Sequence, residues 1–385
     1  MFAIKAKIIF TPLKFLKEAY VIVDKEEIIK ISKEKPRGIK EVYRYDNCFL
    51  SPGLVDMHMH GGFGVDVTYS NTKEILDLSK NLPTTGVTSY MPSVTTDSFK
   101  QMRKAIRNIV DAAKKLNYGS KILGIHLEGP YLNPIKAGAQ PREHIRNPSL
   151  EEFKKFYDES GGMLSRITIA PEIKDGIEFI KDVTKEFEVK VSLGHTNATY
   201  DQALEAFKAG ATIITHLYNG MRSYHHREPG IVGAALTERK VYVEMIADLV
   251  HLHPATLMMT MRCKGPSRIM LVTDSISGTA LGDGSYRLGS QMIIIRGGVA
   301  RLRNGTLAGS TLTMIRAVKN IVKIGEPLRD AIRMSTLTPS KAMGVKGIGK
   351  IAKGYKADFI ILNKKLEVVE TYINGKPMLE GKKSL

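Results

Sequence analysis

Short apolar runs alternate with helix-like segments through the middle of the chain. Eight such runs end at His60, Pro92, Glu128, Pro171, His195, His216, Ala247 and Asp274. Between them, apolar residues recur at the spacing of amphipathic helices, which predicts helices over residues 97–116, 150–157, 175–187 and 200–209. Continuous apolar runs are typical of parallel strands buried on both faces. Eight strand and helix units in series therefore predict an α/β fold, a (β/α)8 TIM-like barrel.

The main rival fold is an open, doubly wound parallel sheet. Such sheets often carry a Gly-x-Gly-x-x-Gly sequence directly after the first strand. No such sequence follows the run that ends at His60. This weakens the rival and favours the closed barrel.

The two ends of the chain have a different pattern, with short strand-like runs and no helical period. Residues 6–10, 19–23 and 28–32 form such runs near the N-terminus, and residues 358–362 and 368–373 near the C-terminus. The last run is followed by the turn sequence Asn374-Gly375. Neither end is long enough to form a core alone. We therefore expect residues 1–51 and 346–385 to form one small β-sandwich domain, and residues 52–345 to form the barrel.

Composition bounds the class of protein and the kind of metal site. The 385 residues, 43% of them hydrophobic, suffice for a barrel of about 250 residues and a smaller domain. No apolar run approaches the roughly 20 residues of a membrane span, and the first ten residues lack a signal-peptide core. We expect a cytoplasmic protein without a membrane partner. Only Cys48 and Cys263 are present, so any metal ion must be held by histidine and carboxylate.

The net charge of +18 has three explanations: nucleic-acid binding, a phosphorylated small substrate, or a lysine-rich surface. A nucleic-acid interface usually gathers its positive residues into one patch or stripe. Here they are spread along the chain and are not interleaved with aromatic residues. This argues against nucleic acid and leaves the other two explanations open.

Histidines and acidic residues stand at the ends of the predicted strands. In a strand, residues two apart point the same way, so His58 and His60 face one side. The C-terminal ends of all barrel strands meet at one mouth, where barrel enzymes have their active sites. Taken singly, each residue has a structural explanation, as a core histidine or a helix cap. Together they predict a metal site, and its residues are His58, His60, Glu128, His195, His216 and Asp274.

Seven short segments carry a resemblance that covers nearly the whole chain. They are Pro-Gly-x-x-Asp-x-His-x-His at 52–60, His-Leu-Glu-Gly-Pro at 126–130, Gly-His-Thr at 194–196, Thr-His-Leu-Tyr-Asn at 215–219, Arg-Glu-Pro-Gly at 227–230, Ile-Ala-Asp at 246–248 with His251, and Val-Thr-Asp at 272–274. With these segments the chain resembles the amidohydrolase superfamily. The segments at 126–130, 215–219 and 227–230 resemble more specifically its deacetylases of N-acetylated sugar 6-phosphates.

The resemblance implies a divalent metal cofactor. Glu128, His195 and His216 match the ligands of an ion that the family always keeps, and His58 and His60 match a second site that some members lack. A binuclear centre bridged by Glu128 is implied, with Zn²⁺ as the first expectation and Fe²⁺, Mn²⁺ or Co²⁺ as alternatives. Such a centre would acidify water and polarise an amide carbonyl.

Asp274 matches the family's acid and base. It would take a proton from the attacking water and return it to the departing amine nitrogen. The structural alternative is that Asp274 caps the segment that begins at Ser275.

The implied reaction is hydrolysis of the acetamide of N-acetylglucosamine-6-phosphate to glucosamine-6-phosphate and acetate. Arg227 and the backbone N–H groups of Asn219 and Gly220 match contacts to the phosphate, and His251 matches a contact to the sugar. Gly138 and Gln140 complete the expected substrate site. Gln140 stands where some relatives have a histidine that helps to hold the substrate carbonyl.

Three alternatives to this reaction remain at this stage. The substrate could be N-acetylgalactosamine-6-phosphate, which differs in the orientation of one hydroxyl. The chain could have another amidohydrolase activity, such as that of a hydantoinase, a dihydroorotase or a purine deaminase. A basic, non-catalytic nucleic-acid-binding protein is the remote alternative. The resemblance also implies a homodimer.

Overall fold

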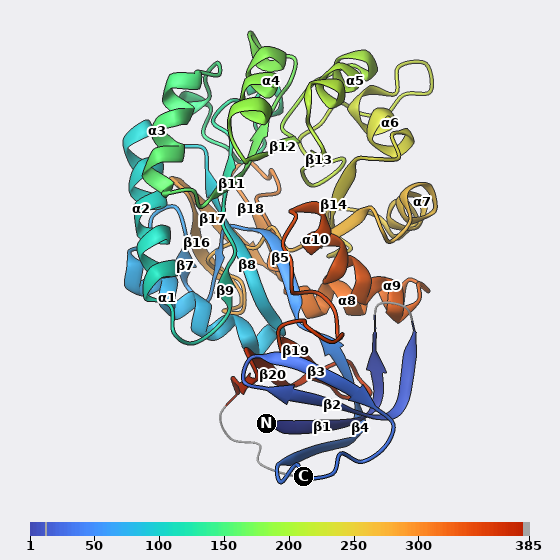
Figure 1. Ribbon diagram of the computed structural model, residues 1–385. Coiled ribbons are helices and arrows are strands. Elements are labelled where there is room, and N and C mark those ends of the chain that lie inside the picture. Colours follow the sequence, from blue (N-terminus) through green and yellow to red (C-terminus); the bar gives the residue numbers. More distant parts are fainter. Residues whose placement is uncertain (12–13, 380–385) are drawn as a thin grey trace.

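Eight parallel strands form the central barrel of the computed structural model, which describes residues 1–11 and 14–379 (Figure 1). In chain order they are β5 (Leu54–Met59), β8 (Val87–Thr95), β10 (Ile125–Glu128), β11 (Leu164–Ile169), β12 (Lys190–Leu193), β13 (Ile213–Ile214), β14 (Tyr242–Ile246) and β15 (Ile269–Val272). Each strand pairs in parallel with the next. The Asp274 N–H donates to the His58 carbonyl at 2.9 Å, which brings the last strand end back to the first. The predicted (β/α)8 barrel is confirmed.

Helices cover the outside of the barrel. They are α1 (Thr72–Asn81), α2 (Phe99–Lys115), α3 (Leu150–Ser160), α4 (Gly176–Glu186), α5 (Tyr200–Ala209), α6 (Gly230–Thr237), α7 (Pro254–Lys264), α8 (Met314–Lys323), α9 (Leu328–Met334) and α10 (Leu337–Ala342). Short 3-10 turns lie at Leu82–Thr85, Pro134–Lys136 and Arg142–His144. The four predicted helices correspond to α2 to α5. In α2, the side chain of Ser98 caps the first turn and Met102, Ile106 and Ile109 are buried, as the helical spacing requires.

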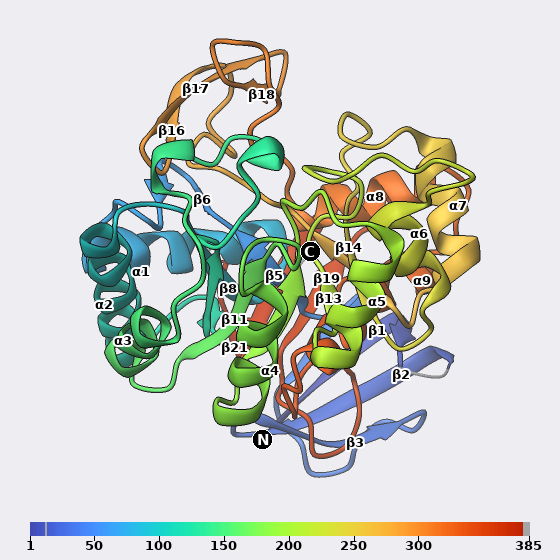
Figure 2. The same ribbon diagram turned by 90° about the horizontal axis from the view of Figure 1, so that it is seen from above.

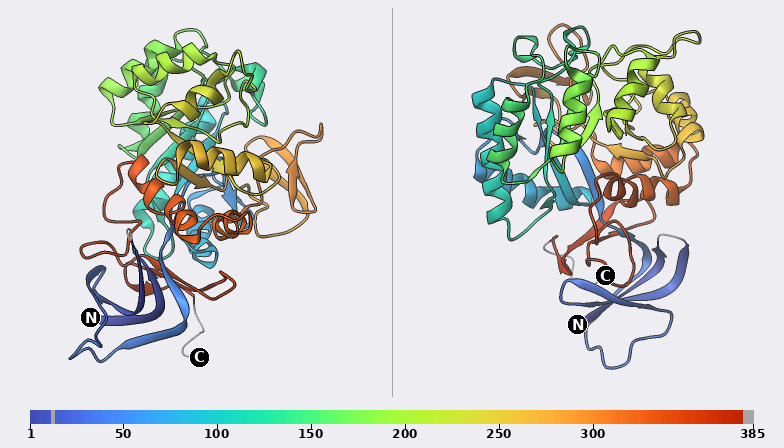
Figure 3. Two further views of the ribbon diagram at one scale, coloured as in Figure 1. Left: turned by 90° about the vertical axis from the view of Figure 1, so that its right-hand side faces the viewer. Right: turned by 45° about the horizontal axis from the view of Figure 1, so that its top comes forward.

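Strands from both ends of the chain form one seven-stranded sheet at the foot of the barrel (Figure 3). The strands are β1 (Phe2–Phe10), β2 (Phe15–Asp24), β3 (Glu27–Ser32), β4 (Val42–Pro52), β19 (Phe359–Leu362), β20 (Val368–Ile373) and β21 (Lys376–Pro377). The two ends meet where β19 pairs antiparallel with β4. Ile4, Leu50 and Phe359 are fully buried in the apolar core that the two ends share. Since β4 runs almost directly into β5, this sheet fixes where the barrel begins.

A small antiparallel sheet follows the last barrel strand and stands out at one side of the barrel (Figure 2). It consists of β16 (Gly284–Leu288), β17 (Gln291–Arg296) and β18 (Val299–Arg301), with buried Ile293 and Ile295 in a core of its own. Two more short elements pair near the mouth, β6 (Gly61–Gly62) with β7 (Val65–Asp66), and β9 (Lys121–Ile122) pairs with β8. Among residues 1–11 and 14–379, no helix is long and apolar enough to cross a membrane.

Candidate metal centre

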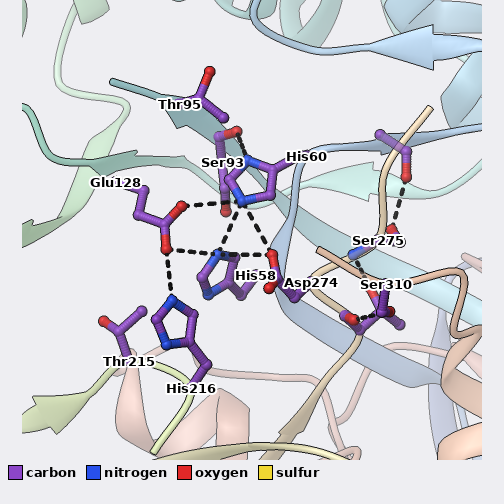
Figure 4. A network of polar contacts seen from close by, with 12 residues as sticks. His58, His60, Ser93, Thr95, Glu128, Thr215, His216, Asp274, Ser275 and Ser310 are labelled. Carbon is purple, nitrogen blue, oxygen red and sulfur yellow. Dashed lines mark hydrogen bonds and ion pairs between the residues drawn. The ribbon is translucent and has the colours of Figure 1, made fainter. Parts of the chain in front are cut away.

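The six predicted side chains lie together at the C-terminal mouth of the barrel. Figure 4 shows five of them pointing toward one another, His58, His60, Glu128, His216 and Asp274. His58 lies in β5 and Glu128 in β10. His60 directly follows β5, and the other three each lie two residues beyond the end of a barrel strand. All six are buried. Their approach depends on the closed barrel, because these positions are far apart in the sequence.

Two groups of three ligand atoms can each hold a metal ion. In the first, Oε1 of Glu128 lies 2.9 Å from Nε2 of His216 and 3.3 Å from Nε2 of His195. The two imidazole Nε2 atoms are 3.2 Å apart. We call Glu128, His195 and His216 the Glu128 group.

The second group consists of His58, His60 and Asp274, and we call it the His58 group. The Nε2 atoms of His58 and His60 are 3.3 Å apart. Oδ1 of Asp274 lies 3.1 Å from Nε2 of His60 and 3.5 Å from Nε2 of His58. Glu128 faces this group as well, because its Oε2 lies 3.1 Å from Nε2 of His60.

These distances suit the ligands of a metal ion better than a hydrogen-bonded cluster. Ligands about 2.0–2.2 Å from a tetrahedral ion lie about 3.3–3.6 Å from one another. Two facing Nε2 atoms can share at most one hydrogen bond, yet Nε2 pairs at this spacing occur in both groups. The residues therefore fit one or two divalent ions, with Glu128 between the two positions.

Backbone strain marks three of the six positions. His195, His216 and Asp274 have positive φ angles of 47°, 29° and 49°. Residues other than glycine adopt this region at a cost of about 1–3 kcal/mol each, and such residues gather at functional sites. The backbone of Asp274 is held on both sides, because Ser310 donates its N–H to the Asp274 carbonyl at 2.7 Å. The fold thus contains an unfavourable backbone conformation at these positions, which orients the side chains into the mouth.

The carboxylates of the centre stabilise positive charge on the neighbouring imidazoles. Burial lowers the pKa of His60, but hydrogen bonds to Asp274 and Glu128 outweigh it and raise that pKa to about 9. Burial likewise lowers the pKa of His58, yet Glu244, Glu128 and Asp274 raise it well above its usual value. A divalent ion would replace protons on these imidazoles, so ion binding should release protons and weaken as the pH falls.

Partners behind the imidazoles orient them toward the centre. His60 donates from Nδ1 to the Ser93 carbonyl at 2.8 Å, and His195 donates from Nδ1 to the Lys136 carbonyl at 2.9 Å. With Nδ1 engaged, both rings would meet an ion through Nε2. Hydrogen-bond partners behind the ligands orient imidazoles in this way in metal sites. Gly220 lies directly behind His195: its φ is +60°, and a Cβ there would lie 2.9 Å from Nδ1 of His195.

Glu244 and Arg166 also contact the centre, and sequence reasoning missed both. Nδ1 of His58 lies 3.0 Å from Oε2 of Glu244, and Arg166 pairs with the other carboxylate oxygen. Burial raises the pKa of Glu244, but Arg166 and His58 lower it to about 2, so the carboxyl is ionised. One signal was available, because each is a charged residue inside an otherwise apolar strand run.

Gln140 and Gly138, which were expected to contact the substrate, lie against residues of the Glu128 group. Gln140 accepts the Thr96 N–H at its Oε1 (2.9 Å) and donates from Nε2 to Oε2 of Glu128 (2.5 Å). Its amide is thus directed at the carboxylate of the centre and held there, whereas the sequence suggested a contact to the substrate carbonyl. Gly138 lies beside His195, where a Cβ would contact the ring at 3.4 Å.

The residues expected to contact phosphate and sugar lie in loops of the mouth. The Asn219 N–H donates to the His216 carbonyl at 3.0 Å, so this expected phosphate donor is engaged within a turn. Arg227 lies exposed before α6, with Nη1 2.8 Å from Nε2 of His226. Nδ1 of His251 lies 2.7 Å from Oδ2 of Asp248. Both residues line a small cavity together with Ser310.

Comparison with known proteins places this geometry in a family. The model of the amidohydrolase family matches residues 49–378, and the chain belongs to that family. It is 35% identical, over 97% of its length and 96% of the relative's, to an N-acetylglucosamine-6-phosphate deacetylase of Bacillus subtilis strain 168. It is 37% identical, over 86% of its length and 88% of the relative's, to an N-acetylgalactosamine-6-phosphate deacetylase of Escherichia coli O157:H7.

Solved structures give the same result. An N-acetyl-D-glucosamine-6-phosphate deacetylase of Mycobacterium smegmatis superposes with a TM-score of 0.92 at 30% identity, covering 98% of this chain and 100% of that one. One from Thermotoga maritima gives a TM-score of 0.89 at 32% identity, covering 98% and 100%. The resemblance found in the sequence segments is confirmed.

Proposed function

We propose that this protein hydrolyses the acetamide of N-acetylglucosamine-6-phosphate, giving glucosamine-6-phosphate and acetate. The observation that carries the proposal is the pair of three-ligand groups joined by Glu128 at the barrel mouth. It occurs in a chain similar over almost its whole length to deacetylases of this substrate. The net charge of +18 is compatible with a phosphorylated substrate.

The proposed cofactor is a divalent ion, with Zn²⁺ as the first expectation and Fe²⁺, Mn²⁺ or Co²⁺ as the other outcomes of a metal analysis. Glu128, His195 and His216 would hold one ion, and His58 and His60 a second. When bound, such ions supply Lewis acidity, which makes water a nucleophile near neutral pH and polarises the acetyl carbonyl. The second ion would make a carbonyl donor at Gln140 unnecessary, in agreement with the contact of Gln140 to Glu128.

Asp274 is proposed as the group that moves the proton. It lies in the His58 group, and its carboxylate reaches the same point as the imidazoles of His58 and His60. Burial raises the pKa of Asp274, but those two imidazoles lower it below its usual value, so it is ionised at neutral pH. An ionised carboxylate can take the proton of the attacking water and pass it to the amine nitrogen, which leaves poorly unless protonated.

The remaining parts of the proposal concern substrate binding and assembly. Arg227 and the N–H groups of Asn219 and Gly220 would bind the 6-phosphate, and His251 the sugar. The N–H of Asn219 would have to leave the His216 carbonyl to do so. We also propose a homodimer that works in the cytoplasm, which light scattering and cell fractionation can test.

A substrate panel tests the proposed function. Acetate release should be measured with N-acetylglucosamine and N-acetylgalactosamine, each with and without the 6-phosphate, before and after treatment with a chelator. We expect the gluco 6-phosphate to be hydrolysed best and chelation to abolish turnover until the ion is restored. The relative from Escherichia coli makes the galacto 6-phosphate the second candidate. Full activity after complete metal removal would overturn the proposal.

Replacing Arg227 by Ala tests the phosphate contact. Hydrogen bonds to charged groups are worth about 1.5–3 kcal/mol, so KM for the 6-phosphate should rise by about 10- to 150-fold. Turnover of an unphosphorylated N-acetyl sugar should hardly change, because that substrate never makes the contact. The measurement is the ratio of kcat/KM for the two substrates.

Arg329 provides the matched control for this change. It is an exposed arginine of α9, paired with Asp330 and adjacent to a cavity that Phe10 and Pro52 line at the foot of the barrel. Replacing Arg329 by Ala removes the same charge far from the mouth and should leave both substrates unaffected. An equal loss for both substrates in the Arg227 variant would rule out a phosphate role.

A further inference from the structure

An ion pair is buried inside the barrel below the candidate metal centre. Arg166 of β11 and Glu244 of β14 are both 0% exposed, and Nη1 of the guanidinium contacts Oε1 of the carboxylate. Burying two charges costs several kcal/mol each, and a well-packed apolar pair is often as stable or more so. Stability alone therefore does not explain why a barrel interior contains this pair.

The second carboxylate oxygen of Glu244 touches both groups of the centre. Oε2 lies 3.0 Å from Nδ1 of His58 and accepts the backbone N–H of His216 at 3.0 Å. A carboxylate can only accept, so Nδ1 of His58 carries a hydrogen toward Glu244, and an ion in the mouth would meet the ring through Nε2. Glu244 thus fixes the tautomer and the orientation of His58, and it holds the strained turn at His216.

Arg166 holds Glu244 in that orientation. Its Nε donates to Oγ of Ser192 at 2.8 Å, its Nη2 donates to Oγ1 of Thr215 at 3.0 Å, and its Nη1 also approaches the Met57 carbonyl at 3.4 Å. The guanidinium nitrogens therefore contact residues in β5, β12 and β14 and the residue that directly follows β13. Arg166 therefore holds the carboxylate of Glu244 in one position below the two groups.

His58 differs from the other imidazoles in the charge of its partner. The Nδ1 atoms of His60 and His195 donate to neutral carbonyls, those of Ser93 and Lys136. Nδ1 of His216 has no hydrogen-bond partner in the part of the chain that the structure describes. Of the four imidazoles of the centre, and within that part of the chain, only His58 has a carboxylate at Nδ1, which makes its Nε2 a better donor to a cation. The two groups are therefore unequal, and the His58 group depends on Glu244 for the strength of a ligand as well as its direction.

We infer that Glu244, held by Arg166, is the positioning residue on which ion binding by the His58 group depends. The inference rests on the proposed metal-dependent function and goes beyond it by assigning the second ion to one buried pair. Loss of such a partner typically weakens metal binding by about 10- to 100-fold. The ion of the Glu128 group should be less affected, because Glu244 contacts that group only at the backbone N–H of His216, and the side chains of Glu128 and His195 keep their contacts.

The test is a double variant, R166M/E244Q, which removes the pair without leaving a lone buried charge. Zn²⁺ per chain is measured during titration with a chelator, beside the unaltered protein. We expect two ions per chain in the unaltered protein. In the variant, one ion should be removed at an about 10- to 100-fold lower chelator concentration, whereas the other should stay bound. In the zinc-loaded proteins, ¹⁵N NMR should show His58 bound through Nε2 with its hydrogen on Nδ1 in the unaltered protein, and a lower share of that form in the variant.

A second variant covers the case in which the double variant does not fold. Glu244→Asp keeps a charge for Arg166 and withdraws the carboxylate from His58 by one methylene, so it should show the same selective loss of one ion. The matched control is K121M/D358N. It breaks another ion pair, 2.6 Å long and with the Asp358 side chain only 2% exposed, between the barrel and the seven-stranded sheet. That variant should lose thermal stability and keep both ions.

The outcomes separate this inference from the proposed function. If the unaltered protein holds two ions and the Glu244 variants lose stability but neither ion affinity nor the His58 tautomer, the pair is merely structural and the inference is wrong. If the unaltered protein holds only one ion, the inference is also wrong, while the deacetylase proposal stands. Active protein without any ion would overturn the proposed function itself.

Discussion

Replacing Asp274 by Asn should lower kcat by about 10²- to 10⁴-fold, the usual contribution of positioned proton transfer. Asparagine has the same shape, and its oxygen can still face His58 and His60, so the metal content should stay near normal. It cannot accept the proton of the attacking water, and the amine would have to leave unprotonated. The measurement combines steady-state kinetics on the 6-phosphate substrate with metal analysis of the same preparation.

Asp97 provides a matched control for this substitution. It is an aspartate, 2% exposed, that follows barrel strand β8, and it accepts the Tyr69 hydroxyl at 2.9 Å. Replacing Asp97 by Asn changes the same charge near the mouth but outside the two ion groups, and should leave kcat within a few-fold. Substantial turnover by a metal-loaded Asp274 variant would remove Asp274 from the mechanism and favour its role as a cap or a ligand.

The fold could be predicted because a parallel barrel imposes a strong pattern on its strands. Each strand is buried on both faces, so even β13, only Ile213–Ile214 in length, stood out as part of an apolar run. The strand β4 was not predicted over residues 42–48. Its first residues are mostly exposed or half-buried, because only one part of this strand packs on the core. Strand prediction thus follows burial and fails where a strand lies at a solvated edge.

The six residues of the centre could be predicted for a topological reason. Strand ends that are far apart in sequence must meet at one mouth, so a residue at a strand end is placed without knowledge of its contacts. The sequence did not show the positive φ angles of His195, His216 and Asp274, which are set by the loops that follow each strand. The sequence thus predicts which residues lie at the strand ends, but not the strained backbone conformation that orients their side chains.

Residues behind the centre could not be assigned from the sequence, because their roles depend on partners on other strands. Arg166 and Glu244 are 78 positions apart, and each contacts a third strand. A charged residue in a buried strand indicates that a partner exists but does not say which one. The same holds for Gln140, whose amide is fixed by Glu128 and by Thr96, the residue that directly follows β8. Orientation within a polar network is a property of the folded chain.

Replacing Glu128 by Gln should have the largest effect in the protein. Glu128 is the carboxylate that faces both ion groups, with Oε1 near His195 and His216 and Oε2 near His60. A neutral amide supplies one weak oxygen and cannot be shared by two ions. We expect bound metal to fall well below one ion per chain and kcat/KM to fall by about 10³-fold or more, the equivalent of several kcal/mol of lost Lewis-acid stabilisation.

Glu370 provides the matched control, and metal addition gives the decisive comparison. Glu370 is buried in β20 of the seven-stranded sheet, where it accepts the Thr371 N–H at 2.8 Å, so its replacement by Gln changes a similar carboxyl away from the mouth. That variant should keep its ions and its activity. Unaltered protein stripped by a chelator should regain activity when the ion is restored, whereas the Glu128 variant should not, because its loss lies in the ligand. Recovery of the Glu128 variant by added metal would mean that the imidazoles suffice to hold the ion.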